Sequence, residues 1–303
     1  MAATAPLRLS GAVLLGLLGY GGHPAVADDA ATPSTPQAAA ADPDAWRFRA
    51  VSYGWLMNVS GNVTARGRMV DVDANFIQLM QKSASLIGFM GYFEADKGPV
   101  GFYTDIVWAK LGFDKSIARA RNPFAGLNIS ATATANATYS LTIVEVGGLY
   151  EFARWPGSPG SFTALDGLLA FRYWNNTIDA TVNLTGSVDF SRLGLERSRS
   201  FGVAQSDSVD WVDPVIGLRL RHQFTPSQEM FVRGDIGGFG FQNRLEWQAV
   251  AAYSYAWQFT GYQLAAAIGY RALGVDSSSG SGLNATSANV VLHGPIIGFS
   301  VRF

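Results

Sequence analysis

From Trp46 to the end of the chain, apolar and polar residues alternate with a period of two. This period is typical of half-buried β-strands, whereas an amphipathic helix repeats every 3.6 residues. Tilted strands that cross a membrane need about 9–11 residues in the hydrocarbon, more than the ~5–6 of an average globular strand. The alternation predicts ten such long strands, at 46–58, 84–97, 100–116, 130–153, 163–183, 210–224, 229–241, 245–259, 262–276 and 288–303.

The connections between these strands alternate in length. Short connections fall at 97–99, 225–228 and 260–261, and the longer ones fall at 59–83, 117–129, 184–209 and 277–287. Short turns on one side and long loops on the other are typical of membrane barrels. We therefore predict an all-β, antiparallel transmembrane β-barrel of about ten strands with both termini in the periplasm. Eight or twelve strands remain alternatives, since 61–73 could form an extra hairpin.

Two prolines interrupt the strand pattern. Pro214 and Pro295 lie inside predicted strands, and proline has no N–H to donate to a neighbouring strand. We expect a β-bulge at each proline, or a strand that begins just beyond it.

Composition fits a barrel better than a soluble domain. Hydrophobic residues make up 48% of the chain and charged residues 15%, yet no segment after the first 27 residues approaches the ~18 apolar residues of a membrane-spanning helix. A barrel resolves this contrast because it meets lipid outside and polar groups inside. The chain has no cysteine and a net charge of −1 without a basic run, so we expect no thiolate site, no cofactor and no nucleic-acid partner.

The first residues predict an export signal. Residues 1–27 combine a basic Arg8, a short apolar core and the small-residue end Ala25-Val26-Ala27, which is the pattern of a cleaved secretory signal peptide. Residues 28–45 are rich in Ala, Pro, Thr and Asp and predict a flexible periplasmic leader. The barrel then occupies 46–303.

Charged residues of both signs fall on the face of the strands that we expect to point into the lumen. An unpaired charge in a narrow interior is costly, so these residues should form ion pairs. The structural interpretation of these charges is a salt-bridge network that fills a small barrel. The functional interpretation is a narrow polar conduit for small solutes. The predicted lumen charges are Arg49, Glu94, Asp105, Glu145, Arg172, Arg219, Arg221, Arg233, Asp235, Glu246 and Arg271.

One segment departs from the period of two. Within 75–83, apolar residues fall at helical spacing, and Asp73 could cap the start of a short helix. Such a helix either gates the mouth or packs on the rim of the barrel. Upstream, Asp71 and Asp73 could form a cation site with Asp276, although aspartates two residues apart are common on exposed strands.

Enzymatic and adhesive functions are the alternatives. A hydrolase of the lipase, deacylase or protease type would need His222 or His293 beside a Ser, Asp or Glu, because a catalytic histidine must reach its partner by a hydrogen bond. The alternation places both histidines on the lipid-facing side, so we predict no catalytic residues and no metal site. An adhesion barrel would act through its outer loops, chiefly 184–209 with Arg192, Glu196, Arg197 and Arg199.

Four segments carry a resemblance to a known group. They are Leu165-Asp166-Gly167-Leu168-Leu169-Ala170-Phe171-Arg172-Tyr173-Trp174, Val212-Asp213-Pro214-Val215-Ile216-Gly217-Leu218-Arg219, Gly234-Asp235-Ile236-Gly237-Gly238-Phe239-Gly240 and the alternating C-terminal strand that ends at Phe303. With these segments the chain resembles porin-like outer-membrane β-barrel proteins of proteobacteria over nearly all of 46–303.

The resemblance implies a location in the bacterial outer membrane, among its lipids and lipopolysaccharide. It also implies that Phe303 is part of the signal read by the barrel assembly machinery. It implies no catalytic residues, and small solutes are the expected ligands of the lumen.

Overall fold

The computed structural model describes residues 45–65, 68–124, 127–190, 195–281 and 286–303. The predicted signal peptide at 1–27 and nearly all of the predicted leader at 28–45 lie outside these residues. The chain divides into Met1–Ala41 and Asp42–Phe303, and all described residues belong to the second unit.

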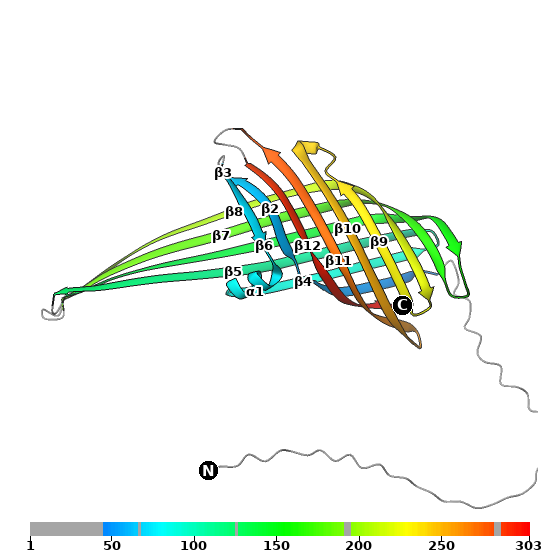
Figure 1. Ribbon diagram of the computed structural model, residues 1–303, viewed down its shortest axis with the longest axis horizontal. Helices are drawn as coiled ribbons and strands as arrows, with labels where there is room; N and C mark the ends of the chain where they lie inside the picture. Colours follow the sequence, from blue (N-terminus) through cyan, green and yellow to red (C-terminus); the bar gives the residue numbers. More distant parts are fainter. Residues whose placement is uncertain (1–44, 66–67, 125–126, 191–194, 282–285) are drawn as a thin grey trace, which may run out of the picture. The chain divides into compact units, whose positions relative to one another are not determined.

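Strands make up most of the described chain (Figure 1). In order, the elements are β1 (Arg47–Trp55), β2 (Asn58–Ala65), β3 (Arg68–Ala74), α1 (Phe76–Lys82), β4 (Ser85–Lys97), β5 (Val100–Phe124), β6 (Leu127–Pro156), β7 (Phe162–Phe190), β8 (Leu195–Thr225), β9 (Gln228–Gly237), the 3-10 helix η1 (Phe241–Asn243), β10 (Arg244–Phe259), β11 (Tyr262–Ser279) and β12 (Thr286–Arg302). Each of the ten predicted strands has a counterpart among them.

Ten of these strands close into a ring. β1 and β4 to β12 pair in sequence order, and β1 closes the ring because it pairs with both β4 and β12. All of these pairings are antiparallel. The short turns and the chain ends at Arg47 and Phe303 lie at one end of the barrel, called the near end here, and the opposite end is the far end.

The ring exposes an apolar belt. Large apolar side chains on the outward face of its strands are exposed; they include Phe102, Val146, Leu169, Phe171, Ile216, Leu218, Val232, Ile268, Ile297 and Phe299. At the near end, the exposed aromatic residues Tyr253, Tyr255, Trp257 and Tyr262 surround the turn between β10 and β11, as an interfacial girdle does. The fold is therefore an antiparallel transmembrane β-barrel. No helix among the described residues is long and apolar enough to cross a membrane.

The hairpin of β2 and β3 widens the sheet beside the ring. β12 pairs with β1 over Phe299 and its neighbours, and it pairs with β2 from Ser287 to His293. β1 and β2 thus share one partner strand, and β3 adds to the far side of β2. This is the extra hairpin that the sequence left open within 61–73.

The expected bulges at Pro214 and Pro295 are absent, because both prolines keep an unbroken register with one neighbour. On the other side, the carbonyl of Pro295 accepts from Leu56 N–H at 2.9 Å, in the gap between β1 and β2. The carbonyl of Pro214 accepts from Gly238 N–H at 3.2 Å, just past the end of β9. Neither proline begins a strand, since they lie within β8 and β12. β1 and β2 keep one register against β12, so Pro295 interrupts this ladder between Trp55 and Asn58. Pro214 lies opposite Gly238, just past the end of β9.

The predicted short helix forms as α1, but its cap differs from the prediction. Asn75, and not Asp73, is the N-cap: its side chain accepts from Gln78 N–H while Gln78 reaches back to Asn75 N–H. Asp73 belongs to β3 and pairs with Ser60. No residue of α1 is fully buried, but Phe76 and Leu79 on one face are half-buried while Ile77 and Met80 are exposed, and the choice between a gate and a rim helix stays a prediction.

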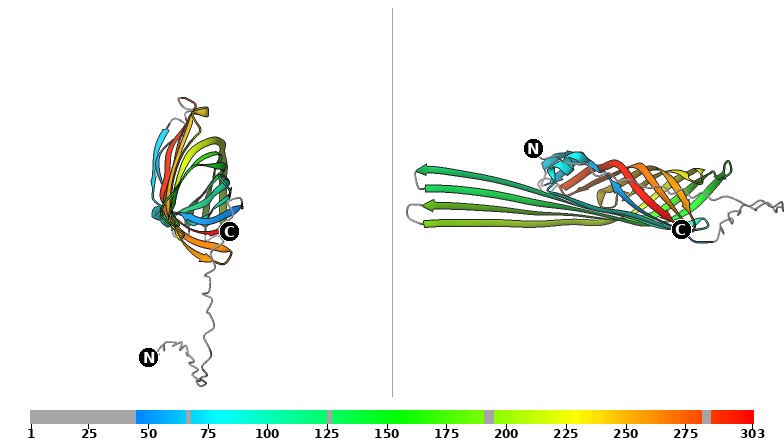
Figure 2. Two further views of the ribbon diagram at one scale, coloured as in Figure 1. Left: turned by 90° about the vertical axis from the view of Figure 1, so that its right-hand side faces the viewer. Right: turned by 90° about the horizontal axis from the view of Figure 1, so that it is seen from below.

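The four strands β5 to β8 continue far beyond the rest of the ring (Figures 1 and 2). β5 leaves its partner β4 after Gly112, and β8 meets β9 only from Val215 onward. Beyond these points only β5, β6, β7 and β8 pair with one another, and we call this part the extension. The loops predicted at 117–129 and 184–209 were therefore wrong, since their described residues are mostly strand. The sequence predicted loops here because the outward-facing positions carry small and polar residues, such as Ser198, Ser200 and Gly202, where a membrane strand carries apolar ones.

Candidate functional site in the barrel lumen

The middle of the lumen is built around Arg172. Its guanidinium lies 2.6 Å from Glu145, 2.7 Å from Asp235 and 3.3 Å from Glu246, and the side chain is 0% exposed. Arg233 pairs with the same Glu145 and Asp235, and the hydroxyl of Tyr103 also donates to Glu145. Strands β5, β6, β7, β9 and β10 supply these groups, because each strand contributes alternate residues to the interior. The result is a fully paired charge cluster.

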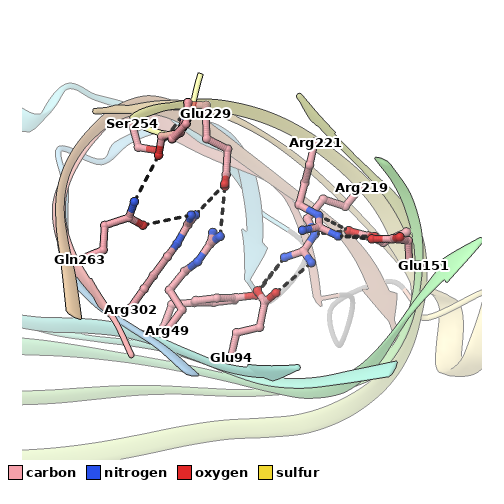
Figure 3. A network of polar contacts seen from close by, with 12 residues as sticks. Arg49, Glu94, Glu151, Arg219, Arg221, Glu229, Ser254, Gln263 and Arg302 are labelled. Atoms are coloured by element: carbon pink, nitrogen blue, oxygen red, sulfur yellow. Dashed lines mark hydrogen bonds and ion pairs between the residues drawn. The ribbon is translucent and has the colours of Figure 1, made fainter. Parts of the chain in front are cut away.

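A second cluster lies nearer the near end (Figure 3). Arg219 binds Glu94 at 2.7 Å and Asp166 at 2.8 Å, and Arg221 shares Asp166 at 2.7 Å. On the other side of the lumen, both Arg49 and Arg302 bind Glu229, at 3.1 and 2.7 Å. Figure 3 shows these guanidinium groups pointing inward from opposite walls.

Arg271 lies at the border between polar and apolar layers. One of its terminal nitrogens, Nη1, donates to Asp105 at 2.8 Å and to the hydroxyl of Tyr53 at 2.8 Å. The guanidinium carbon lies 4.9 Å from the ring centre of Trp55. Among the described residues, Nε and Nη2 of Arg271 are buried without a hydrogen-bond partner. Arg271 is thus only partly satisfied.

An apolar layer closes the lumen toward the far end. Asp105, Glu145 and Arg172 lie side by side on the paired strands β5, β6 and β7. Two residues closer to the far end, the same strands carry Val107, Ile143 and Trp174. These last three belong to a buried cluster with Trp55, Met57, Met90, Leu141, Leu273, Val275 and Leu292. The stacked rings of Trp174 and Trp211, 5.5 Å apart, lie at the edge of this layer.

A cavity of about 140 Å³ remains inside the barrel. Its lining includes two carboxylates, Asp105 and Glu229, with phenols and small apolar side chains between the charges. Its arginines are Arg49, Arg219, Arg233, Arg271 and Arg302. Two of these arginines, Arg219 and Arg233, are also paired with carboxylates behind the lining, namely Glu94, Asp166, Glu145 and Asp235, so the charge of the wall is largely compensated.

All eleven predicted lumen charges take part in ion pairs inside the barrel. They are Arg49, Glu94, Asp105, Glu145, Arg172, Arg219, Arg221, Arg233, Asp235, Glu246 and Arg271. Their functional role stays a prediction. The prediction missed Asp166, Asp213, Glu229 and Arg302, which complete the pairs. Strand alternation places Asp213 and Arg302 on the inward face, so the sequence held that signal.

The histidines lie outside the lumen. Arg221 points inward to Asp166, so the adjacent His222 points outward, where its Nδ1 lies 2.9 Å from the hydroxyl of Thr163. His293 Nδ1 lies 2.7 Å from the hydroxyl of the exposed Tyr270. Neither contact joins a histidine to a serine or a carboxylate.

The suggested cation site does not come together. Asp71 and Asp276 lie in one row through Asn62 and Asn289, three strands apart, which separates them by roughly 14 Å. The described residues contain no group of three or more His, Asp or Glu side chains arranged to hold a metal ion.

Phe303 lies on the outward face at the near end. Its backbone exchanges hydrogen bonds with Phe48, at 2.8 and 3.1 Å, and the two rings stack with centres 5.6 Å apart. Phe303 is 60% exposed. The structure thus leaves this side chain open to a partner, and its role as an assembly signal stays a prediction.

Taken together, the ring, the apolar belt and the paired interior define a small transmembrane β-barrel whose lumen is closed by side chains. No protein-family model and no curated protein sequence matches this chain.

Several solved structures share a limited likeness. The outer-membrane protease OmpT of Escherichia coli matches with a TM-score of 0.36 and 7% identity, over 86% of this chain and 97% of that one. A FadL homologue of Pseudomonas aeruginosa matches with 0.27 and 8%, over 85% and 90%. The attachment invasion locus protein Ail of Yersinia pestis matches with 0.23 and 10%, over 85% and 98%. These TM-scores are low, and the roles of those proteins are not transferred to this chain.

Proposed function

We propose that this protein is a bacterial outer-membrane β-barrel that gives gated passage to small solutes and is closed in the conformation described. The export signal predicted at 1–27, the apolar belt and the even ring of strands support the outer-membrane location. Lipid and lipopolysaccharide surround such a barrel, and the assembly machinery inserts it.

The observation that carries the gating proposal is the incomplete satisfaction of Arg271. A buried donor without a partner costs about 1–3 kcal/mol, and Arg271 leaves two such nitrogens under Trp55. The same side chain lines the cavity, where a solute that displaces Trp55 would meet its free nitrogens.

A filled, purely structural barrel is the second candidate. This candidate is favoured by the complete pairing of Arg172, because its ion pairs fill the middle of the lumen. The two candidates differ in one property, because a structural barrel conducts nothing even when its apolar layer is thinned.

The contacts of the histidines give the hydrolase alternative no support, since they join His222 to Thr163 and His293 to Tyr270. The adhesion alternative loses its proposed outer loop, because the described parts of 184–209 are strand. Neither alternative is therefore pursued as the main function.

Single-channel conductance of refolded Asp28–Phe303 in a planar bilayer tests the proposal. We expect rare, brief openings in the native protein and frequent openings in Trp55→Ala, because the smaller side chain uncovers Arg271. In a salt gradient, Arg271→Gln should shift the reversal potential of the openings toward cations, because it removes a positive charge from the conducting path.

The matched control is Trp257→Ala, which removes an exposed tryptophan of the girdle and should leave conductance unchanged. A folded native barrel and a folded Trp55→Ala variant that are both silent would refute the gating proposal and support the structural barrel.

A further inference from the structure

The extension has one apolar face and one polar face. Alternate residues of β6 and β7 separate cleanly by polarity, and the register of the strands brings like residues together. One face carries Ala131, Ala133, Ala135, Ala137, Ile178, Ala180, Val182 and Leu184, and the other carries Ser130, Thr132, Thr134, Asn136, Thr177, Asp179, Thr181 and Asn183. We call the apolar side the inner face.

The inner face is exposed and continues onto β8. Polar residues interrupt it at Lys115 on β5 and at Gln205 and Asp207 on β8. Val182 pairs with Val203, and Leu184 pairs with Phe201, so four large side chains lie next to one another. Phe201 is 65% exposed and Leu184 is 49% exposed. A contiguous exposed apolar surface of this kind marks a site of interaction.

The inner face is the continuation of the lumen wall. On β5 and β6 the register runs without a shift from the buried Val107 and Ile143, through Leu111 and Tyr139, into the extension. The alternate residues that point into the lumen within the ring therefore form the apolar face of the extension. The residues between them, which face lipid within the ring, are mostly Thr, Ser and Asn in the extension. Since the polar face continues the surface that meets the bilayer, the bilayer is not the partner of the inner face.

Arginines border the inner face at its distal part. Arg119 and Arg199 share one row through Ala131 and Gly186, and Arg197 lies one row farther out. All three side chains are exposed. Two copies in the same membrane that packed inner face to inner face would bring these arginine rows together, and such like-charge contacts oppose that dimer.

We propose that the inner face binds an anionic amphiphile, with its apolar chain along the band from Leu111 to Leu184 and its acidic head group at Arg119, Arg197 and Arg199. The rows of Leu111 and Arg119 are eight residues apart on β5, or roughly 26 Å, which is room for a long chain. The chain would end at the apolar layer that closes the lumen. Binding at this surface requires no passage through the barrel, so it goes beyond the proposed function.

Fluorescence titration with 11-(dansylamino)undecanoic acid tests the proposal, using refolded Asp28–Phe303 in nanodiscs of neutral lipid and empty nanodiscs as the blank. The double substitution Leu184→Ser with Phe201→Ser should weaken binding by about tenfold or more, because it removes apolar contacts. Arg197→Gln with Arg199→Gln should weaken binding of the acid by about tenfold but leave its methyl ester unchanged.

The matched control is Thr185→Ala with Ser200→Ala. This pair is adjacent in sequence to Leu184 and Phe201 but lies on the polar face, and we expect it to bind the probe as the native protein does. All of these positions lie outside the ring, so each variant should fold, as a heat-dependent gel shift can verify.

Three results would overturn the proposal. Native affinity in the Leu184 and Phe201 variant would show that the inner face is not the site. Equal binding of acid and ester, unchanged in the arginine variant, would exclude recognition of an acidic group. A native protein that is dimeric by mass measurement, and monomeric in the Leu184 and Phe201 variant, would show that a second copy covers the face.

Discussion

At the scale of single residues, the lumen depends on arginines that serve several carboxylates at once. Arg172 alone binds Glu145, Asp235 and Glu246 in a fully buried position. Removing one partner of a buried ion pair is far more damaging than removing an exposed one, because the remaining charges stay buried and unpaired. The contribution of such an arginine to the stability of the barrel therefore depends on how deeply it is buried.

The first prediction concerns Arg172. Arg172→Met should lower the free energy of unfolding of the refolded barrel by about 3–5 kcal/mol, since three carboxylates lose their shared partner. Urea unfolding followed by tryptophan fluorescence measures this. Arg154→Met is the control: Arg154 is 38% exposed and pairs with Glu151, so its loss should cost no more than about 1 kcal/mol. Equal effects in both variants would contradict the buried network.

The second prediction concerns the close approach at Gly294. A Cβ at this position would lie 2.0 Å from the carbonyl oxygen of Leu56, where β12 passes from β1 to β2. Gly294→Ala should therefore reduce the yield of folded barrel and lower its melting temperature. Gly54→Ala, in the adjacent β1, meets no heavy atom within 4 Å and should behave like the native protein. A normal melting temperature for Gly294→Ala would show that the strands can separate there at little cost.

At the scale of elements, the extension is independent of the ring. Beyond Gly112 and before Val215, its strands pair only with one another. The strand pairings that close the ring therefore do not involve these residues. The edges at β5 and β8 are unpaired in this region, and exposed edges can recruit other chains. Charged residues such as Lys115 and Arg199 line these edges and oppose that pairing.

The third prediction follows from this independence. Replacing 114–136 and 180–205 each with an Asn-Gly turn would join strands that already face each other, Phe113 to Ala137 and Asp179 to Ser206. The shortened barrel should refold with the native heat-dependent gel shift and lose binding of the dansyl fatty acid. Failure to refold, in spite of intact ring strands, would show that the extension helps to assemble the ring.

At the scale of the whole molecule, closure of the ring depends on the two ends of the chain. β1 and β12 meet over Arg49 and Arg302, and the backbones of Phe48 and Phe303 extend this pairing by one more step. The exposed ring of Phe303 adds little to the folded barrel beyond its contact with Phe48. A role in assembly is therefore separable from a role in stability.

The fourth prediction uses that separation. Phe303→Ala should refold in detergent with native stability but reach the outer membrane of cells in reduced amounts, as measured by membrane fractionation. Phe299→Ala is the control, since it lies on the same strand and face and is 69% exposed. If both variants reached the outer membrane in similarly reduced amounts, the effect would come from the loss of apolar surface in general. If Phe303→Ala reached it in normal amounts, Phe303 would not be an assembly signal.

The sequence by itself determined the strand class, favoured ten strands over eight or twelve, and assigned eleven of the charges to the inward face. This is because side chains alternate across a strand, so that polarity at every second residue reports which face is buried. Arg172 and Glu145 could be assigned to the lumen in this way without knowledge of their partners. The helical spacing in 75–83 likewise predicted α1.

Only the tertiary structure decided which charges pair, where the strands end and what the prolines do. Pairing of Arg172 with Asp235 depends on the register and curvature that bring β7 and β9 together, and alternation within one strand carries no such information. The parts of the extension at 117–129 and 184–209 escaped prediction because the polarity of the extension is reversed relative to the ring, with the lumen side apolar and the lipid side polar. Pro295 interrupts the ladder where β12 passes from β1 to β2, and this place is defined only by the pairing of β12 with both strands.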